Sequence, residues 1–133
     1  MENSAGQKIT TFLMFSGQAE EAINHYISLF EQSEIKSIFH NDQGGVLHAV
    51  FTLKGQTFMA IDSIVKHDFT MTPAISLFVE CETEDEIERL YEQLSAGGKI
   101  LMPLAASPVA VKFGWVEDKY GVSWQLNLPK GQT

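Results

Sequence analysis

The chain has 133 residues, of which 44% are hydrophobic and 20% are charged. That length and composition predict one globular domain with a real hydrophobic core. Seventeen acidic residues outnumber nine basic ones, which gives a formal net charge of −8. Because nucleic acids and anionic membranes attract clustered lysine and arginine, we expect neither as a partner.

Cys81 is the one cysteine, so the chain can form neither an intrachain disulfide nor a cysteine zinc site. We expect a small buried side chain there. No apolar run approaches the ~20 residues that a membrane span needs. The opening residues, MENSAGQK, lack the apolar stretch of a signal peptide. These features predict a cytoplasmic protein.

The first half of the chain predicts a strand over residues 9–15, a helix from about residue 19, and then three strands. The helix is indicated by apolar residues at i, i+3, i+4 and i+7, which are Ile23, Tyr26, Ile27 and Phe30. The strands fall at residues 34–40, 46–53 and 56–62. Lys54-Gly55 is a two-residue hairpin signal between the last two.

The second half repeats this order, beginning with a strand over residues 74–80. Its helix has an apolar stripe at the same spacing, formed by Ile87, Leu90, Tyr91 and Leu94. Thr83 and Glu86 can form a capping box, and Gly97-Gly98 can end the helix. Strands follow at residues 99–104, 111–117 and 122–128, with a proline-punctuated loop at 103–110 and a turn at 118–121. The two stripes begin at residues 23 and 87, an offset of 64.

The chain therefore reads as βαβββ followed by βαβββ, which predicts an α+β fold. We expect two modules, at about residues 8–66 and 73–129, that form a curled mixed sheet. Neither half could bury its helix-facing sheet well alone. We therefore expect both to belong to a single domain spanning residues 8–129.

Three segments resemble the PhnB-like proteins of the vicinal oxygen chelate superfamily, which includes glyoxalase I, extradiol dioxygenases and the bleomycin and fosfomycin resistance proteins. The segments are FLMFSGQAEEAINHYISLF, GGKILMPL and FGWVEDKYGVSWQL. The resemblance implies a glyoxalase/bleomycin resistance/dihydroxybiphenyl dioxygenase-like fold, with sheets that form cups, and a homodimer. Some PhnB-like proteins carry a 3-demethylubiquinone-9 3-methyltransferase label. This chain lacks the glycine-rich loop of a common methyl-donor fold.

The same resemblance places the four metal-ligand positions of the superfamily at Thr11, Ala60, Ala74 and Gln125. Shifting the first or the third by two residues reaches Leu13 or Ser76. None of these six residues is a histidine or a carboxylate, which divalent transition metals commonly require. We therefore expect no metal and no other cofactor.

An apolar cup with a few polar groups suits a small organic ligand. The predicted ligand-binding residues are Phe15, Phe58, Asp62, Phe78, Phe113, Trp115 and Gln125. Trp124 alternates with Gln125 along the strand, so we expect Trp124 in the core on the helix side. Gln125 has two open interpretations: it contacts the ligand, or backbone and water satisfy it at the cup wall.

These features favour metal-independent binding of a small organic molecule, and the sequence identifies no catalytic residue. Two alternatives stay open. One is a glyoxalase- or dioxygenase-type metalloenzyme with atypical ligands such as Asp62, Gln125 or a histidine. The other is a non-catalytic dimer that acts through a protein partner. The four histidines, which show no paired ligand spacing, are His25, His40, His48 and His67.

Overall fold

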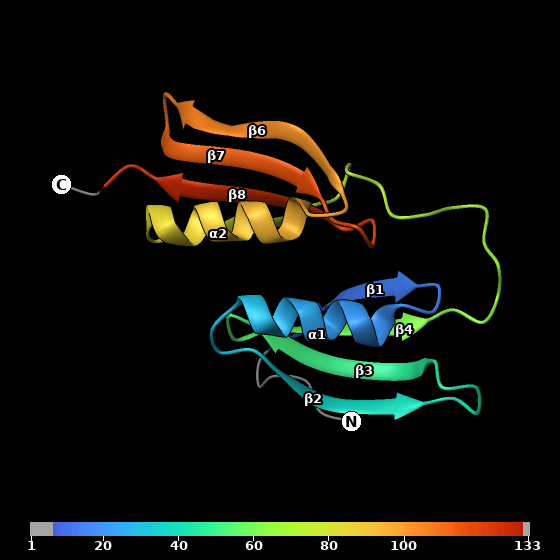
Figure 1. Cartoon of the computed structure of the whole chain (residues 1–133). Helices are drawn as coiled ribbons and strands as arrows, with labels where there is room; N and C mark the ends of the chain where they lie inside the picture. Colours follow the sequence, from blue (N-terminus) through green and yellow to red (C-terminus); the bar gives the residue numbers. More distant parts are fainter. Residues whose placement is uncertain (1–6, 132–133) are drawn as a thin grey trace. The chain divides into compact units, whose positions relative to one another are not determined.

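The structure, a computed structural model, describes residues 7–131. The chain divides into two compact units between His67 and Asp68 (Figure 1). Each unit holds one helix and one four-stranded mixed sheet in the order βαβββ. The predicted α+β class and both modules are confirmed. Their union in one domain remains a prediction.

The first unit is built around a sheet with strand order β1-β4-β3-β2. β1 pairs in parallel with β4, and the other neighbours are antiparallel. Helix α1 lies along one face of this sheet (Figure 1). The elements are β1 (Thr11–Phe15), α1 (Ala19–Leu29), β2 (Glu34–His40), β3 (Val46–Leu53) and β4 (Gln56–Asp62). The bounds of β2, β3 and β4 match the predicted ranges.

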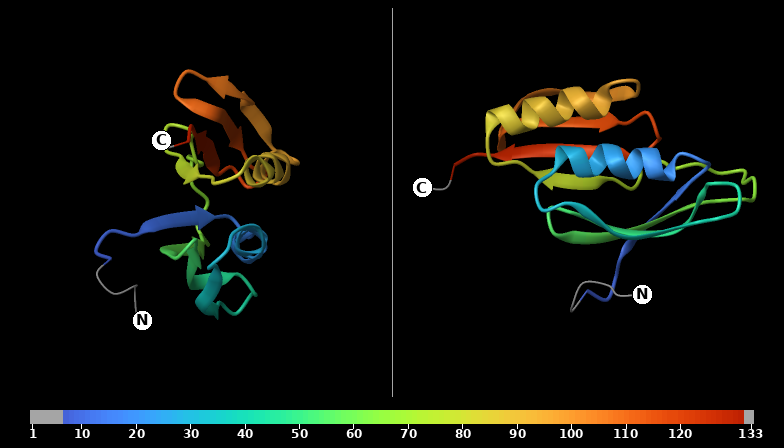
Figure 2. Two further views of the ribbon diagram at one scale, coloured as in Figure 1. Left: turned by 90° about the vertical axis from the view of Figure 1, so that its left-hand side faces the viewer. Right: turned by 60° about the horizontal axis from the view of Figure 1, so that its bottom comes forward.

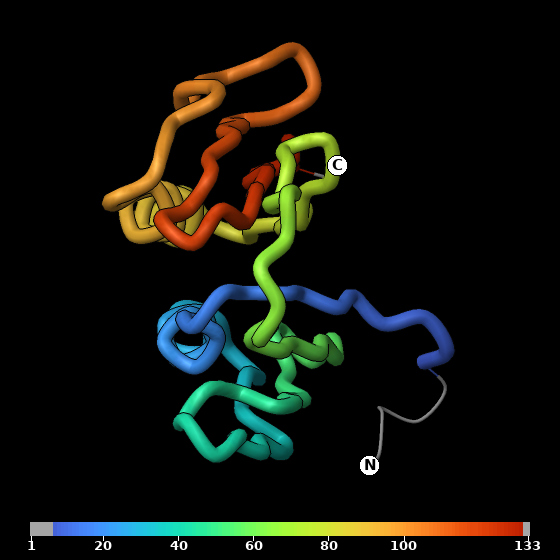
Figure 3. The backbone as a smooth tube through the Cα atoms, turned by 90° about the vertical axis from the view of Figure 1, so that its right-hand side faces the viewer, coloured from blue at the N-terminus to red at the C-terminus, as the bar shows by residue number. Residues whose placement is uncertain are grey.

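The second unit repeats this topology, with strand order β5-β8-β7-β6 and a parallel β5–β8 pair. Figure 2 shows both helices from two further sides, and Figure 3 shows the single stretch of chain that connects β4 to β5. The elements are β5 (Leu77–Glu80), α2 (Glu84–Ser95), β6 (Lys99–Ser107), β7 (Ala110–Glu117) and β8 (Ser123–Pro129). Within residues 7–131, no helix is long and apolar enough to cross a membrane.

The repeat extends to the pairing of individual residues. Leu13 pairs with Ala60 in the first unit, and Leu77 pairs with Trp124 in the second. Both pairs are related by the offset of 64 residues that separates the two helix stripes. Ala60 is therefore the counterpart of Trp124, and both side chains are buried in their units.

The loop predicted at residues 103–110 is wrong for most of its length, because β6 continues to Ser107. Only Pro108 and Val109 form the turn into β7. β6 is the edge strand of the second sheet, so it has no neighbouring strand on one side. An edge strand tolerates a proline such as Pro103, because the missing N–H costs no hydrogen bond where no neighbour is present. The pairing of β6 with β7 also contains several register shifts, which accommodate the irregular sequence.

The hairpin between β3 and β4 confirms the predicted two-residue turn. Lys54 has a φ of 50° and Gly55 has a φ of 80°. Two successive positive φ angles are the mark of a type I′ turn, whose twist matches that of the flanking strands. This turn fixes the register between β3 and β4. The register in turn sets the position of Asp62 at the end of β4.

The predicted cap of α2 by Thr83 is confirmed, and the Glu86 side chain bonds back to the residue before Thr83. Thr83 Oγ1 accepts a hydrogen bond from Glu86 N at 3.1 Å, and Glu86 Oε1 accepts one from Glu82 N at 2.8 Å. We expect Thr83→Ala to lower the free energy of unfolding by about 1 kcal/mol, measured by urea denaturation. Thr83→Ser keeps the acceptor and should cost much less. Equal losses in the two variants would contradict this role for the hydroxyl.

Candidate functional site

Helix α2 covers one face of the second sheet, and the side chains that face it form the core of that unit. A Cβ atom placed on Gly114 would lie 3.2 Å from a ring carbon of Tyr91 on α2. Trp124 and Leu126 are at most 1% exposed. The predicted core position of Trp124 therefore agrees with its burial.

The opposite face of the second sheet, called the open face below, carries a row of residues from three adjacent strands. Gln125 on β8 pairs with Phe78 on β5 and with Trp115 on β7. Paired residues of neighbouring strands point to the same face of a sheet. Phe113, two residues before Trp115, shares this face, and its ring centroid lies 6.5 Å from that of Phe78.

One ring of the open face is exposed and the other members of the row are partly accessible. Phe78 is 55% exposed, and Phe113, Trp115 and Gln125 are all half-buried. Four of the seven predicted ligand-binding residues are thus brought together on one surface. The result is an aromatic surface with an amide between two of its rings.

A chain of hydrogen bonds holds Trp115 in place at the end of this row. Trp115 Nε1 donates to Ser123 Oγ at 2.8 Å, and Ser123 Oγ is 2.6 Å from Ser76 Oγ. Ser123 is buried, although its residue type is usually exposed. Since the indole N–H is already engaged, Trp115 presents its ring rather than a hydrogen-bond donor to the open face. Sequence reasoning missed the link to Ser76, for which spacing gives no signal.

The Gln125 side chain differs from its polar neighbours in its hydrogen bonding. Asn127 Nδ2 donates to Glu80 Oε1 at 2.9 Å, on the same face of the sheet. Among residues 7–131, the amide of Gln125 has no hydrogen-bond partner. A half-buried amide without a protein partner is available to water or to a ligand.

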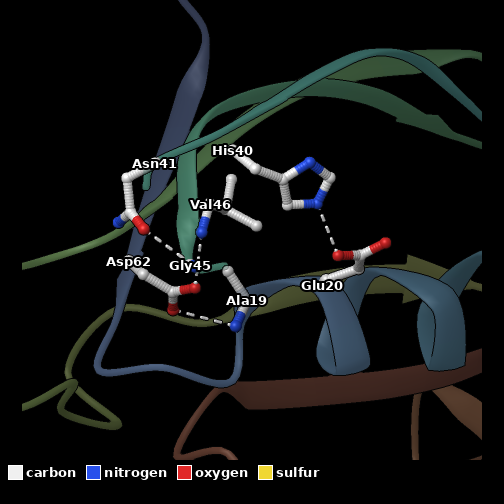
Figure 4. A network of polar contacts seen from close by, with 7 residues as sticks. All are labelled: Ala19, Glu20, His40, Asn41, Gly45, Val46 and Asp62. Carbon is white, nitrogen blue, oxygen red and sulfur yellow. Dashed lines mark hydrogen bonds and ion pairs between the residues drawn. The ribbon is translucent and has the colours of Figure 1, made fainter. Parts of the chain in front are cut away.

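Asp62, in contrast, is deeply engaged within the first unit. Its Oδ1 accepts hydrogen bonds from Gly17 N at 2.7 Å and Ala19 N at 3.0 Å, and its Oδ2 accepts one from Val46 N at 3.0 Å. Figure 4 shows the carboxylate between the start of α1 and the start of β3. Gln18, at the N-cap of α1, makes no side-chain cap. Asp62 caps the helix from a distant strand, where the helix dipole also favours negative charge.

Asn41 belongs to the network of polar contacts in Figure 4. Its Oδ1 accepts hydrogen bonds from Gln43 N at 2.9 Å and Gly45 N at 3.0 Å, which closes the turn between β2 and β3. His40 Nε2 lies 2.7 Å from Glu20 Oε1 at the exposed start of α1. These contacts hold the turn between β2 and β3 and the start of α1 in place. They do not direct a side chain toward a ligand.

Phe15 and Phe58 lie on the same covered side of the first sheet as Asp62. Phe15 pairs with Asp62 and is 4% exposed. Phe58 stacks on the fully buried Phe51, with centroids 5.5 Å apart. These three residues therefore lie on the helix-covered face of their own unit. The ligand role of all seven residues remains a prediction.

The donor set does not fit the metal site that the superfamily implies. The row around Gln125 supplies two aromatic rings and one neutral amide, and at offset 64 the counterpart of Gln125 is Ile61 rather than Ala60. Isoleucine has no donor atom. Within the described part of the chain, no three His, Cys, Asp or Glu side chains gather as a metal site would require.

The fold is shared with proteins of the glyoxalase/bleomycin resistance/dioxygenase type. A glyoxylase/bleomycin resistance protein/dioxygenase domain from Frankia sp. EAN1pec superposes with a TM-score of 0.67 at 13% identity, covering 96% of this chain and all of the other. The fosfomycin resistance protein FosX from Listeria monocytogenes, in a complex with Mn(II), gives 0.62 at 9% identity, covering 92% and 91%. These two likenesses concern the fold alone.

The chain belongs to the 3-demethylubiquinone-9 3-methyltransferase family, whose model matches residues 7–127. A PhnB protein from Bacillus cereus is 61% identical, with a TM-score of 0.90 over 92% of this chain and 99% of the other. Protein YjdN of Escherichia coli K12 is 30% identical over 87 residues, or 65% of this chain. The match spans only 58% of that curated relative.

Proposed function

We propose that the open face of the second sheet binds a small organic molecule with an aromatic or amphipathic body, and that binding needs no metal. The observation that carries the proposal is the row in which Phe78 and Trp115 flank the amide of Gln125, which no described residue hydrogen-bonds. Sites for small organic ligands are lined mainly by hydrophobic and aromatic side chains, with a few polar groups that fix the orientation of the ligand.

The methyl transfer named in the family description is not favoured by the chain itself. A dinucleotide- or methyl-donor-type site uses a glycine-rich loop between a strand and a helix. The two strand–helix junctions here read Ser-Gly-Gln, at residues 16–18, and Cys-Glu-Thr, at residues 81–83. Neither carries the repeated glycines of such a loop, so binding is the better-supported function.

The proposal is tested with N-phenyl-1-naphthylamine, a neutral aromatic probe whose fluorescence rises when it is bound. A neutral probe is chosen because the formal net charge of −8 would repel anionic dyes. We expect Phe78→Ala to weaken probe binding about tenfold, because one exposed ring of the surface is lost. Titration of the probe into wild type and variant gives the two dissociation constants.

Ile100→Ala is the matched control. Ile100 is 52% exposed, close to the 55% of Phe78, but it pairs with the buried Val116 on the side of the sheet that α2 covers. Its substitution should change probe affinity by less than about twofold. Equal losses in the two variants would show binding to apolar surface in general and would overturn the proposal. Loss of probe binding after dialysis against EDTA would contradict metal independence.

The predicted homodimer is part of the same proposal. Native mass spectrometry of untagged protein, purified without chelator, reports the mass of the assembly, any bound metal and any retained organic molecule. A dimer with extra organic mass would support a binding role. A dimer that carries one transition metal per subunit would favour the metalloenzyme alternative instead.

A further inference from the structure

We infer that Gln125 selects ligands whose planar ring carries a hydrogen-bond donor beside an acceptor, as in a lactam or a ring carboxamide. This inference rests on the proposed function and names the ligand class of the same open face.

The glutamine side chain offers a carbonyl acceptor and an NH₂ donor side by side at its end. Its best complement is an edge with the reverse order, because both hydrogen bonds then form at once. Within residues 7–131, no group satisfies the amide of Gln125. An entirely apolar ligand that covered this half-buried amide would leave both of its polar ends unpaired, which disfavours such ligands.

The polar side chains next to Gln125 on β8 that share the open face are already engaged. The N–H of Trp115 is donated to Ser123, and Ser123 is bonded to Ser76. The Asn127 amide donates to Glu80. The amide of Gln125 is therefore the group on this part of the sheet that has both a donor and an acceptor to offer.

The flanking rings define the shape of the complementary ligand. Phe78 and Trp115 stand on the strands on either side of the strand that carries Gln125. Neighbouring strands are about 4.8 Å apart, so the two rings rise from backbones roughly 10 Å apart. A flat ligand can contact the rings while its edge reaches the amide between them. Aromatic contact and paired hydrogen bonding thus favour one class of molecule.

The test compares two bicyclic probes of the same size, quinolin-2(1H)-one and quinoline. The first presents an N–H beside a carbonyl, and the second presents a ring nitrogen as an acceptor only. We expect the lactam to bind wild-type protein about tenfold more tightly than quinoline. Its binding should also shift the side-chain NH₂ signals of Gln125 in ¹H–¹⁵N spectra, which are assigned by their loss in Gln125→Met.

Gln125→Met keeps the length of the side chain and removes its hydrogen-bonding groups. We expect it to weaken lactam binding about a hundredfold, because two hydrogen bonds are lost, and quinoline binding about tenfold, because one is lost, so that the two probes bind the variant equally. If quinoline and the lactam bind wild type equally, with the proposed function intact, the inference about Gln125 is overturned alone. If neither probe nor the neutral dye binds, both the inference and the proposed function fail.

Discussion

Asp118→Ala is expected to cost about 3–5 kcal/mol of the free energy of unfolding, measured by urea denaturation. Asp118 is 3% exposed. Its Oδ1 accepts hydrogen bonds from Tyr120 N at 2.9 Å and Val122 N at 3.0 Å, and its Oδ2 accepts one from Trp124 Nε1 at 2.9 Å. Alanine leaves all three donors without this partner. Because small domains are stable by only about 5–15 kcal/mol, the variant should lie near the limit of folding.

A double-mutant cycle isolates the part of this effect that involves Trp124. Asp118→Asn keeps Oδ1 as an acceptor for the turn, but it can place an NH₂ group against the indole N–H. The cost of Asp118→Asn should therefore fall by about 1–2 kcal/mol when Trp124 is already replaced by phenylalanine. A coupling below about 0.5 kcal/mol would show that the indole bond contributes little and would refute this account of the hairpin.

The final hairpin is the segment that most resembles metal-binding relatives. Its residues have different structural roles in this protein. Asp118 and Gly121 form the turn: Gly121 has a φ of 94°, and its N–H donates to Asp118 O at 3.0 Å. Trp124 packs in the core. Of these four, Gln125 alone is directed to the open face and has no side-chain hydrogen bond within residues 7–131. Alternation along β8 predicts this separation from the sequence, because a strand has a side-chain period of two.

Alternation along β4 shows which residues share a face of the first sheet, but it does not show which of the two faces α1 covers. The sequence therefore predicts Phe58 and Asp62 on a ligand-binding face, whereas the structure has them on the covered face. A strand with apolar residues on both faces, such as Gln56–Asp62, gives no clear polar face from which to choose. The face is decided by contacts distant in sequence, above all those of Asp62 with Gly17 and Ala19. The offset of 64 would have found it, since Ala60 is then matched to the core residue Trp124.

The repeat itself, the helix stripes and most strand bounds could be predicted because they depend on local patterns. The length of β6 could not, because an edge strand tolerates Pro103 and register shifts that sequence alone reads as a loop. The link between Ser76 and Ser123 joins residues 47 positions apart. Such contacts are products of the assembled sheet, and hydroxyl residues alone do not predict them.

Asp62→Ala is the second substitution for which we expect a large loss, about 3–5 kcal/mol in the free energy of unfolding. It removes the acceptor of three backbone N–H groups at once, those of Gly17, Ala19 and Val46. It also removes the remote cap of α1, whose own N-cap residue supplies no side-chain bond. Urea denaturation of purified wild type and variant measures the difference.

Asp42→Ala is the matched control, since Asp42 is exposed in the turn before β3 and its substitution should change stability by less than about 0.5 kcal/mol. Asp62→Asn refines the test. Its remaining carbonyl oxygen can still accept from Gly17 and Ala19, whereas its NH₂ group faces the N–H of Val46. Hydrogen exchange should therefore quicken most at the Val46 amide. If Asp62 were instead a free ligand-binding group, Asp62→Ala would be as stable as the Asp42 control, and the structural role argued from its three bonds would be wrong.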